Sequence, residues 1–371
     1  MEFNKGHRKL AKYLFVIISG VLLLTFIGCS NVLYLSQAIA GHFRIMSSRE
    51  PIKKLLETNE FDNETKDKLK LALEVREYAS RELDLPRNKS YTVFSKVKGQ
   101  YVGWNIFCAP KFSVEPIQWC FPIAGCVVYR GYFSKNGALK FAGKMEKKGF
   151  DVFISPISAY STLGWYNDPL LSSHLRLDSI HLARLIIHEL THQKFYVPGD
   201  SRFNEGFASA VERVGVLRWL KSIGRDDQVV QAIQIQEKDD IKIAKILDAR
   251  SQLINIYHSK IDPDSMSQKK DSIFNDLKLK LSNADHAGIN LPKSDEQDIV
   301  LNNAYLVPVF TYHSLGPIFQ SMLDSVDGNL PQFYINVKKL GDLPFKERQR
   351  KLDSLQIKFL NLKVEEHRIK R

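Results

Sequence analysis

The 371-residue sequence predicts an α+β fold, with a mixed sheet followed by two consecutive helices and by additional helices. Apolar side chains recur at about every third or fourth position in residues 31–84 and in most of the chain after residue 180, and this spacing is typical of helices. Residues 91–133 instead contain short runs rich in β-branched and aromatic residues, separated by Gly and Pro. Hydrophobic residues make up 44% of the chain and no repeat interrupts it, so we expect residues 30–371 to form a single domain around one core.

Residues 1–29 have the pattern of a targeting segment. A basic region comes first, with Lys5, Arg8, Lys9 and Lys12. The apolar run that follows, Leu14–Ile27, is shorter than the about 20 residues of a membrane span. The run ends in Phe26-Ile27-Gly28-Cys29, which resembles a bacterial lipobox with Phe26 in place of the usual leucine. We therefore expect a lipid anchor on Cys29 and a place at the periplasm-facing membrane of the bacterial cell envelope, with an uncleaved signal anchor as the alternative.

The predicted elements follow one another along the chain. Helices come first, in an apolar stretch that ends at Ile45, in Pro51–Leu56 and in Glu64–Leu83. Strands at Tyr91–Phe94 and Cys126–Tyr129, a crossover helix at Ala138–Lys148 and a strand at Val152–Leu163 come next. We expect this last strand to be the final one before the next helix. It contains Pro156, which is tolerated at the edge of a sheet and disfavoured in the middle.

Three cysteines remain after Cys29. In an oxidising compartment, the Pro and Gly between Cys120 and Cys126 favour a tight loop that a disulfide between these two residues closes. Cys108 is then left over, and we expect it to be buried as a small hydrophobic residue. A second zinc site at these cysteines would need the paired spacing of structural zinc sites, which the sequence lacks.

The string His188-Glu189-Leu190-Thr191-His192 indicates a metal-binding site with catalytic chemistry. Residues i and i+4 of a helix lie on one face, so both imidazoles can bind one metal ion, and Glu189 lies beside them where it can reach a water on that metal. The preceding residues, 180–187, are mostly apolar, which indicates a buried helix with its histidine edge open to a cleft.

A third ligand follows at Glu205, thirteen residues after His192 and at the start of another amphipathic run. Residues 197–201 between the two runs favour a turn, so the chain can reverse there and return Glu205 to the histidines. Two histidines and one glutamate, with water in the fourth position, are an established catalytic zinc set, which predicts one Zn²⁺ per chain. The alternative is structural, with hydrogen-bonded histidines in the core and a first-turn glutamate favoured by the helix dipole.

These strings resemble a known family. His188–Gln193 and Asn204–Ser209, with Glu212 following, are similar to the zinc core of the gluzincin metallopeptidases, particularly the M1 aminopeptidases, although the connection is shorter and no Gly-Ala-Met-Glu-Asn string is present. A closer resemblance is to a family of bacterial predicted aminopeptidases, usually lipoproteins, through Trp119–Cys126 and Tyr160–Trp165.

The resemblance implies a zincin-like metallopeptidase core, with Glu205 as third ligand, and an exported zinc aminopeptidase that acts on peptides or proteins. It also implies that an edge strand, here Val152–Pro156, borders the cleft and pairs with the substrate backbone. Residues 158–164 then either line the substrate groove or form an exposed connector. The oxyanion donor is expected to be Tyr312, with Tyr305 and His313 as alternatives. For each tyrosine, a purely structural place in the core is the other interpretation.

In the implied mechanism, zinc lowers the pKa of its bound water towards about 7, and Glu189 takes the proton of that water and returns it to the leaving amine. Amino-terminal trimming also needs an acidic group for the substrate ammonium, and the candidates by residue type are Glu115, Asp168 and Glu212. An envelope zinc endopeptidase and a non-catalytic zinc-binding scaffold lipoprotein stay open. Against the scaffold, no Cys or His lies between His192 and Glu205 to fill a fourth position.

The formal net charge is +12, but the basic residues are interspersed with other types and no nucleic-acid-binding motif is present, so we expect no nucleic-acid partner. A basic surface near anionic lipid is the simpler interpretation. Residues of about 222–296 form a charged, helical insertion whose charges we interpret as a solvated helix face without chemistry. Residues 346–371 predict a basic amphipathic helix that packs on the domain and touches the membrane surface.

Overall fold

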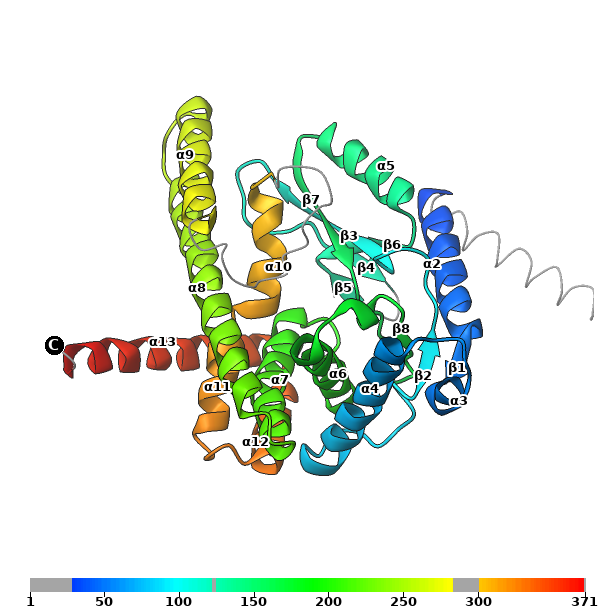
Figure 1. The fold of residues 1–371 in the computed structure, drawn as a ribbon. Helices are drawn as coiled ribbons and strands as arrows, with labels where there is room; N and C mark the ends of the chain where they lie inside the picture. Colours follow the sequence, from blue (N-terminus) through cyan, green and yellow to red (C-terminus); the bar gives the residue numbers. More distant parts are fainter. Residues whose placement is uncertain (1–28, 122–124, 283–299, 370–371) are drawn as a thin grey trace, which may run out of the picture.

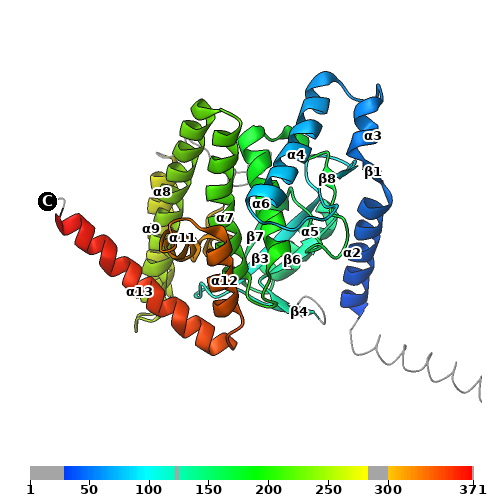
Figure 2. The same ribbon diagram turned by 90° about the horizontal axis from the view of Figure 1, so that it is seen from below.

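The computed structural model describes residues 29–121, 125–282 and 300–369, most of which are helical (Figures 1 and 2). The predicted targeting segment lies outside the described residues, except for Cys29, with which the first described helix begins. Among the described helices, none has both the length and the apolar character needed to cross a bilayer.

The amino-terminal part contains the three predicted helices. They are α2 (Cys29–Ser47), α3 (Ile52–Glu57) and α4 (Asn63–Glu82). The start of α4 is fixed by Asp62, whose carboxylate accepts a hydrogen bond from the backbone N–H of Thr65 at 2.8 Å. The apolar residues of α4, including Leu69 and Val75, face inwards and are fully buried.

The strands form three small sheets. In the first, β1 (Arg49–Pro51) is antiparallel to β2 (Val93–Ser95), and β2 is parallel to β8 (Leu170–Leu171). In the second, β3 (Gly103–Pro110) lies between β6 (Tyr129–Tyr132) and β7 (Phe150–Ile157) and is antiparallel to both. The third is the hairpin of β4 (Trp119–Phe121) and β5 (Gly125–Val127). The fold is therefore α+β, as predicted, with small mixed and antiparallel sheets.

Two predictions about the sheet have opposite outcomes. The strand that contains Pro156 is indeed an edge strand, because among the described strands β7 pairs only with β3. Helix α5 (Lys135–Glu146) connects it to β6. The prediction that this strand is the last before the helix that contains His188 and His192 is wrong, because β8 (Leu170–Leu171) lies between them. A two-residue strand has no periodicity to detect, and it forms only because β2 offers a parallel partner.

The remaining described residues are mostly helical. The helices are α6 (Ser179–Lys194), α7 (Ser201–Ser222), α8 (Asp226–Tyr257), α9 (Pro263–Ser282), α10 (Asn303–His313), α11 (Gly316–Asp324), α12 (Leu330–Gly341) and α13 (Phe345–Ile369), preceded by the short 3-10 helix η1 (His174–Arg176). In Figure 1, α8 and α9 form a long hairpin on one side of the molecule, and α13 points away from the body.

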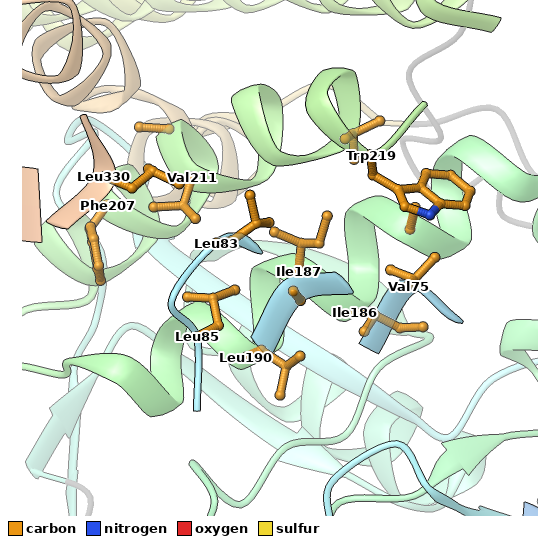
Figure 3. Close-up of a cluster of buried hydrophobic side chains, with 14 of the residues drawn as sticks. Val75, Leu83, Leu85, Ile186, Ile187, Leu190, Phe207, Val211, Trp219 and Leu330 are labelled. Atoms are coloured by element: carbon orange, nitrogen blue, oxygen red, sulfur yellow. The ribbon is translucent and has the colours of Figure 1, made fainter. Parts of the chain in front are cut away.

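The main hydrophobic core surrounds α6 and α7 (Figure 3). Ile186 and Ile187 of α6 and Trp219 of α7 are each at most 1% exposed, and they meet Val75 of α4. Truncating such a side chain to alanine typically costs about 2–5 kcal/mol. The two helices are therefore fixed against each other by packing, and this rigid pair is the frame for the polar residues at its edge.

The cysteines are arranged as the sequence indicates. Cys120 and Cys126 face each other across the hairpin and form a disulfide. Cys108 is free and fully buried in β3. Burial, with a smaller contribution from the charge of Glu146, raises the pKa of the Cys108 thiol to about 12.

We expect Cys108 to resist alkylation in the native protein, because at pH 8 a thiol of that pKa is thiolate in only about one molecule in ten thousand. Iodoacetamide treatment followed by peptide mass spectrometry tests this. Without reductant, the peptides with Cys120 and Cys126 should be linked, and Cys108 should be labelled only after denaturation. Rapid native labelling of Cys108, or free thiols at the other two positions, would contradict the arrangement.

Candidate metal centre

Helix α6 presents its two histidines at one edge of the core. The helix starts at Asp178, whose side chain accepts a hydrogen bond from the backbone N–H of His181 at 2.8 Å. Its apolar residues, such as Ile187 and Leu190, are fully buried. His188 and Glu189 are only partly buried, while His192 is 6% exposed. The polar edge thus opens towards solvent while the opposite face is held in the core.

The chain reverses sharply between α6 and α7, and Asn204 fixes this reversal. Its side chain accepts a hydrogen bond from Val197 N–H and donates one to Val197 C=O, both at 2.8 Å. Asp200 caps α7 through Phe203 N–H and also accepts a hydrogen bond from the buried Arg348 of α13 at 2.8 Å. These contacts place Glu205, the residue after Asn204, beside the histidines.

The three predicted ligands come together. Nε2 of His188 lies 3.1 Å from Oε2 of Glu205 and 3.1 Å from Nε2 of His192, and the remaining pair of atoms is 3.7 Å apart. Zinc bound tetrahedrally at about 2.0–2.2 Å separates its ligand atoms by about 3.3–3.6 Å. The spacing and the donor types therefore fit one such ion. We call these three residues the candidate metal centre.

The charges of the candidate metal centre are strongly coupled. Burial raises the pKa of Glu205, but the two imidazoles outweigh this effect and hold the pKa at about 2. Burial lowers the pKa of His188, and its hydrogen bonds with Glu205 and Glu212 outweigh burial, so the pKa lies above the usual value. The Nδ1 atom of His192 is buried and has no hydrogen-bond partner among the described residues.

A buried polar chain supports His188 from behind. Nδ1 of His188 lies 2.9 Å from Oε2 of Glu212, the other oxygen of Glu212 binds Arg184, and Nη1 of Arg184 donates to Asp239 of α8 at 3.1 Å. Burial raises the pKa of Glu212, but the charges of Arg184 and His188 dominate and hold it at about 2. Such a carboxylate fixes the orientation of a metal-binding imidazole.

The sequence did not predict this row of hydrogen-bonded side chains behind His188. In the sequence, Glu212 is part of the string that resembles a zinc core and a candidate for the substrate ammonium, and Asp239 is part of the charge pattern interpreted as a solvated face. Asp239 is in fact 7% exposed. The signal for Glu212 was its spacing, because it lies seven residues after Glu205 and hence on nearly the same face of α7. Asp239 carried no comparable signal, since its partner lies on another helix.

The sequence candidates for binding a substrate ammonium are already engaged. Asp168 is fully buried and accepts hydrogen bonds from Ser161, Thr162 and Gln193. Glu115 binds Arg250 at 2.8 Å, and Glu212 binds His188 and Arg184. Glu189 differs, because none of the described residues forms a hydrogen bond with its carboxylate, which is partly exposed.

Tyr312 lies near the candidate metal centre. Burial, followed by the charge of Glu205 and nearby groups that include Glu189, raises the pKa of Tyr312 well above its usual value. Tyr305 is 1% exposed and packs on Phe153, with ring centroids 5.2 Å apart. Seven residues along α10 separate the two tyrosines by about 10 Å. His313 is partly buried, and loss of solvation lowers its pKa to about 4, against an opposing effect of the Glu212 charge.

Two further tyrosines lie close to Glu205. Burial is the main reason that the pKa values of Tyr129 and Tyr196 are raised, and the charge of Glu205 is the next cause for both. Tyr129 belongs to β6, the edge of the second sheet opposite to β7. The expectation that Val152–Pro156 borders the cleft stays a prediction, and Tyr129 adds β6 as a second strand whose electrostatics respond to Glu205. No sequence pattern distinguished these two edges.

The fold and these contacts define an α+β protein whose two consecutive helices carry a possible His-His-Glu metal site. The chain belongs to the family described as putative aminopeptidase, whose family model matches residues 33–352. Comparison with curated proteins and with solved structures gives no significant match. Family membership thus agrees with the resemblance seen in the sequence.

Replacing Glu212 with Gln should weaken zinc binding about 10- to 100-fold, because the neutral amide no longer fixes the His188 ring. Asp240→Asn is the matched control, since Asp240 pairs with Arg213 and is more than half exposed. Competition with a chromophoric chelator measures the affinity, and far-UV circular dichroism checks the fold. Equal affinities of folded E212Q and wild type would show that Glu212 does not support the metal ligand.

Proposed function

We propose that this protein is a zinc-dependent metallopeptidase with a zincin-like core, acting as an aminopeptidase on peptides or proteins at the bacterial cell envelope. The observation that carries the proposal is the convergence of His188, His192 and Glu205 beside the unpartnered carboxylate of Glu189. Family membership supports the same reaction class. The proposal includes attachment to the membrane through a lipid on Cys29, or through an uncleaved signal anchor.

The donor set favours zinc, with one ion per chain held by His188, His192 and Glu205. Imidazole and carboxylate are established zinc ligands, and three protein ligands leave a position for water. When bound, the ion supplies a Lewis acid that lowers the pKa of water and polarises the substrate carbonyl. The buried pair of Glu212 and Arg184 would hold His188 in place throughout.

Glu189 is the general base in this proposal. As the water oxygen forms a bond to the carbonyl carbon, the Glu189 carboxylate accepts a proton from that water. The carboxylic acid then returns the proton to the amine as the C–N bond breaks. A carboxylate without a hydrogen-bond partner is suited to this task, because no existing contact has to be lost before the water binds.

Tyr312 is the proposed donor to the oxyanion of the tetrahedral intermediate. Its phenol stays protonated at neutral pH, because burial and the charge of Glu205 raise its pKa well above 10. A protonated hydroxyl can donate to a negative oxygen, and such donors are worth about 10²–10³ in turnover. We prefer Tyr312 to Tyr305 for this role, because Tyr305 packs in a cluster of apolar side chains.

A zinc endopeptidase is the second candidate function. It is favoured by the engagement of Glu115, Asp168 and Glu212, since none of them is free to bind a substrate ammonium. The two functions differ in their response to a blocked amino terminus. An aminopeptidase should cleave a free-amine peptide and leave its N-acetylated form intact, whereas an endopeptidase should cleave both.

Glu189→Gln should abolish hydrolysis of both peptide forms while the protein keeps its zinc, because the amide has the same shape but cannot accept the proton. Glu237→Gln, at an exposed position of α8, is the control and should behave like wild type. Peptide cleavage by mass spectrometry and zinc content by atomic absorption are the measurements. Activity of E189Q within about tenfold of wild type would exclude Glu189 as the base.

Tyr312→Phe should lower kcat by about 10²–10³ and leave KM and zinc content nearly unchanged, because the hydrogen bond forms fully only in the transition state. Tyr305→Phe removes the same hydroxyl from the same helix and should change kcat little. Steady-state kinetics on the peptide that is cleaved best compares the two. If Tyr312→Phe keeps full turnover, Tyr129→Phe and Tyr196→Phe become the next variants to test.

A further inference from the structure

Helix α2 packs on the body of the protein through one face only. Gly41 lies directly against the ring of Phe133, so that a Cβ at this position would come within 2.1 Å of it. Gln37 binds the edge of β6 by accepting a hydrogen bond from Phe133 N–H at 3.0 Å. Ile45, four residues after Gly41, is 4% exposed. These residues define the inner face of α2 and leave the opposite face outside.

The outer face of α2 carries an apolar stripe. Leu35, Ile39 and Phe43 follow one another at intervals of four residues and are 37%, 56% and 65% exposed. At 1.5 Å per residue they lie about 9, 15 and 21 Å along the helix from Cys29. In both Figure 1 and Figure 2, α2 lies at the outer edge of the molecule, and no other described element covers its outer side.

The stripe continues into the loop between β7 and β8. The ring of His42 contacts Phe43 and also Tyr166, with centroids 5.9 and 5.3 Å apart. Nδ1 of His42 also lies 2.6 Å from the hydroxyl of Tyr160. Tyr166 is 54% exposed and Trp165, next to it, is 78% exposed. We call Leu35, Ile39, Phe43, Trp165 and Tyr166 the outer apolar surface.

Charges are sparse on and around this surface. Residues 34–50 contain two basic residues and one acidic residue, Arg44, Arg49 and Glu50, and residues 158–167 contain none, which gives a net charge of +1 (two minus one). An exposed apolar patch of this kind marks an interaction site. A row of aliphatic residues that ends in Trp and Tyr, with slight positive charge, suits the interface of a bilayer with anionic lipids.

The position of α2 in the chain indicates that a membrane covers the outer apolar surface. The helix begins at Cys29, directly after the apolar run 14–27. If that run is kept, it holds the start of α2 at the bilayer, and if Cys29 is lipidated, the lipid does so.

We propose that the outer apolar surface docks on the membrane, so that α2 lies in the bilayer interface and the loop of Trp165 and Tyr166 inserts beside it. The docked loop is fixed to the metal helix, because Gln193 of α6 donates a hydrogen bond to Asp168 at the end of the loop. Docking therefore holds the candidate metal centre close to the bilayer in one orientation, which an amino-terminal anchor alone would not do.

Fluorescence quenching tests the docking independently of hydrolysis. The full chain is reconstituted into vesicles of phosphatidylethanolamine and phosphatidylglycerol, with or without bromine on the acyl chains near the headgroups. The chain has four tryptophans, and the W165F variant identifies the emission of Trp165. We expect brominated lipid to quench Trp165 at least about twofold, because docking would place the indole in the interface.

The double variant I39D/F43D should remain bound to the vesicles through its amino terminus but lose most of the quenching of Trp165. Ile241→Asp, at a position on α8 that is 54% exposed, is the control and should keep it. Unquenched Trp165 in wild type would overturn the proposal, as would failure of the chain to float with the vesicles. Detergent-solubilised dimers that dissociate in I39D/F43D would also overturn it, because they would show that a second copy covers the stripe.

Discussion

The two hydrogen bonds between Asn204 and Val197 are the contacts on which the candidate metal centre depends most directly. Glu205 can meet the histidines of α6 only if the chain reverses within a few residues, and these bonds close that reversal at both the N–H and the C=O of one peptide residue. Asn204 is 1% exposed, so no water competes for the bonds. Gly206, two residues after Asn204, completes the constraint, because a Cβ there would lie 2.8 Å from Phe319 of α11. In the Asn-Glu-Gly-Phe string, Asn204 fixes the turn and Glu205 is a candidate metal ligand. Gly206 allows close packing on α11, and Phe207 belongs to the hydrophobic core.

Buried charge is the second constraint. Glu212, Arg184 and Asp239 lie together behind His188, and a buried charge is tolerated only when it is paired and hydrogen-bonded. In this group of three side chains, the guanidinium of Arg184 lies between the carboxylates of Asp239 and Glu212, so each carboxylate has the guanidinium as its partner. Removing one member leaves an uncompensated charge, which typically costs about 3–5 kcal/mol. Helix α8 therefore supports the candidate ligand His188, because it supplies Asp239.

Local patterns in the sequence predicted the parts of the structure that depend on local geometry. The i, i+4 spacing of His188 and His192 and the edge position of Pro156 follow from the geometry of one helix and one strand. The features that were missed depend on partners far apart in the chain. Asp239 is buried with Arg184 as its partner, and the pKa of Tyr129 on β6 responds to the charge of Glu205. Tyr305 and Tyr312 are seven residues apart and so lie on the same side of α10, and the sequence alone therefore does not say which of them is the oxyanion donor. Their different packing partners in the folded protein distinguish them.

The face of α6 that carries Glu189 also meets a strained loop. Gln193, one turn after Glu189, binds Asn88, Ser90 and Asp168, and the backbone N–H of Tyr91 donates to Asp168 C=O at 2.7 Å. Tyr91 has φ of 61°, a conformation that costs a non-glycine residue about 1–3 kcal/mol.

The Tyr91 hydroxyl is fully buried without a hydrogen-bond partner among the described residues. Burial, then the charges of Glu189 and Asp168, raises the pKa of this phenol well above its usual value. Strained backbone and an unpaired hydroxyl both lower stability, and the surrounding hydrogen bonds of Gln193 and Asp168 offset that cost. The unpaired Tyr91 hydroxyl thus lies within electrostatic reach of Glu189 but is enclosed by the protein, so the cost of burying it is held inside the core, next to the helix that carries His188 and His192.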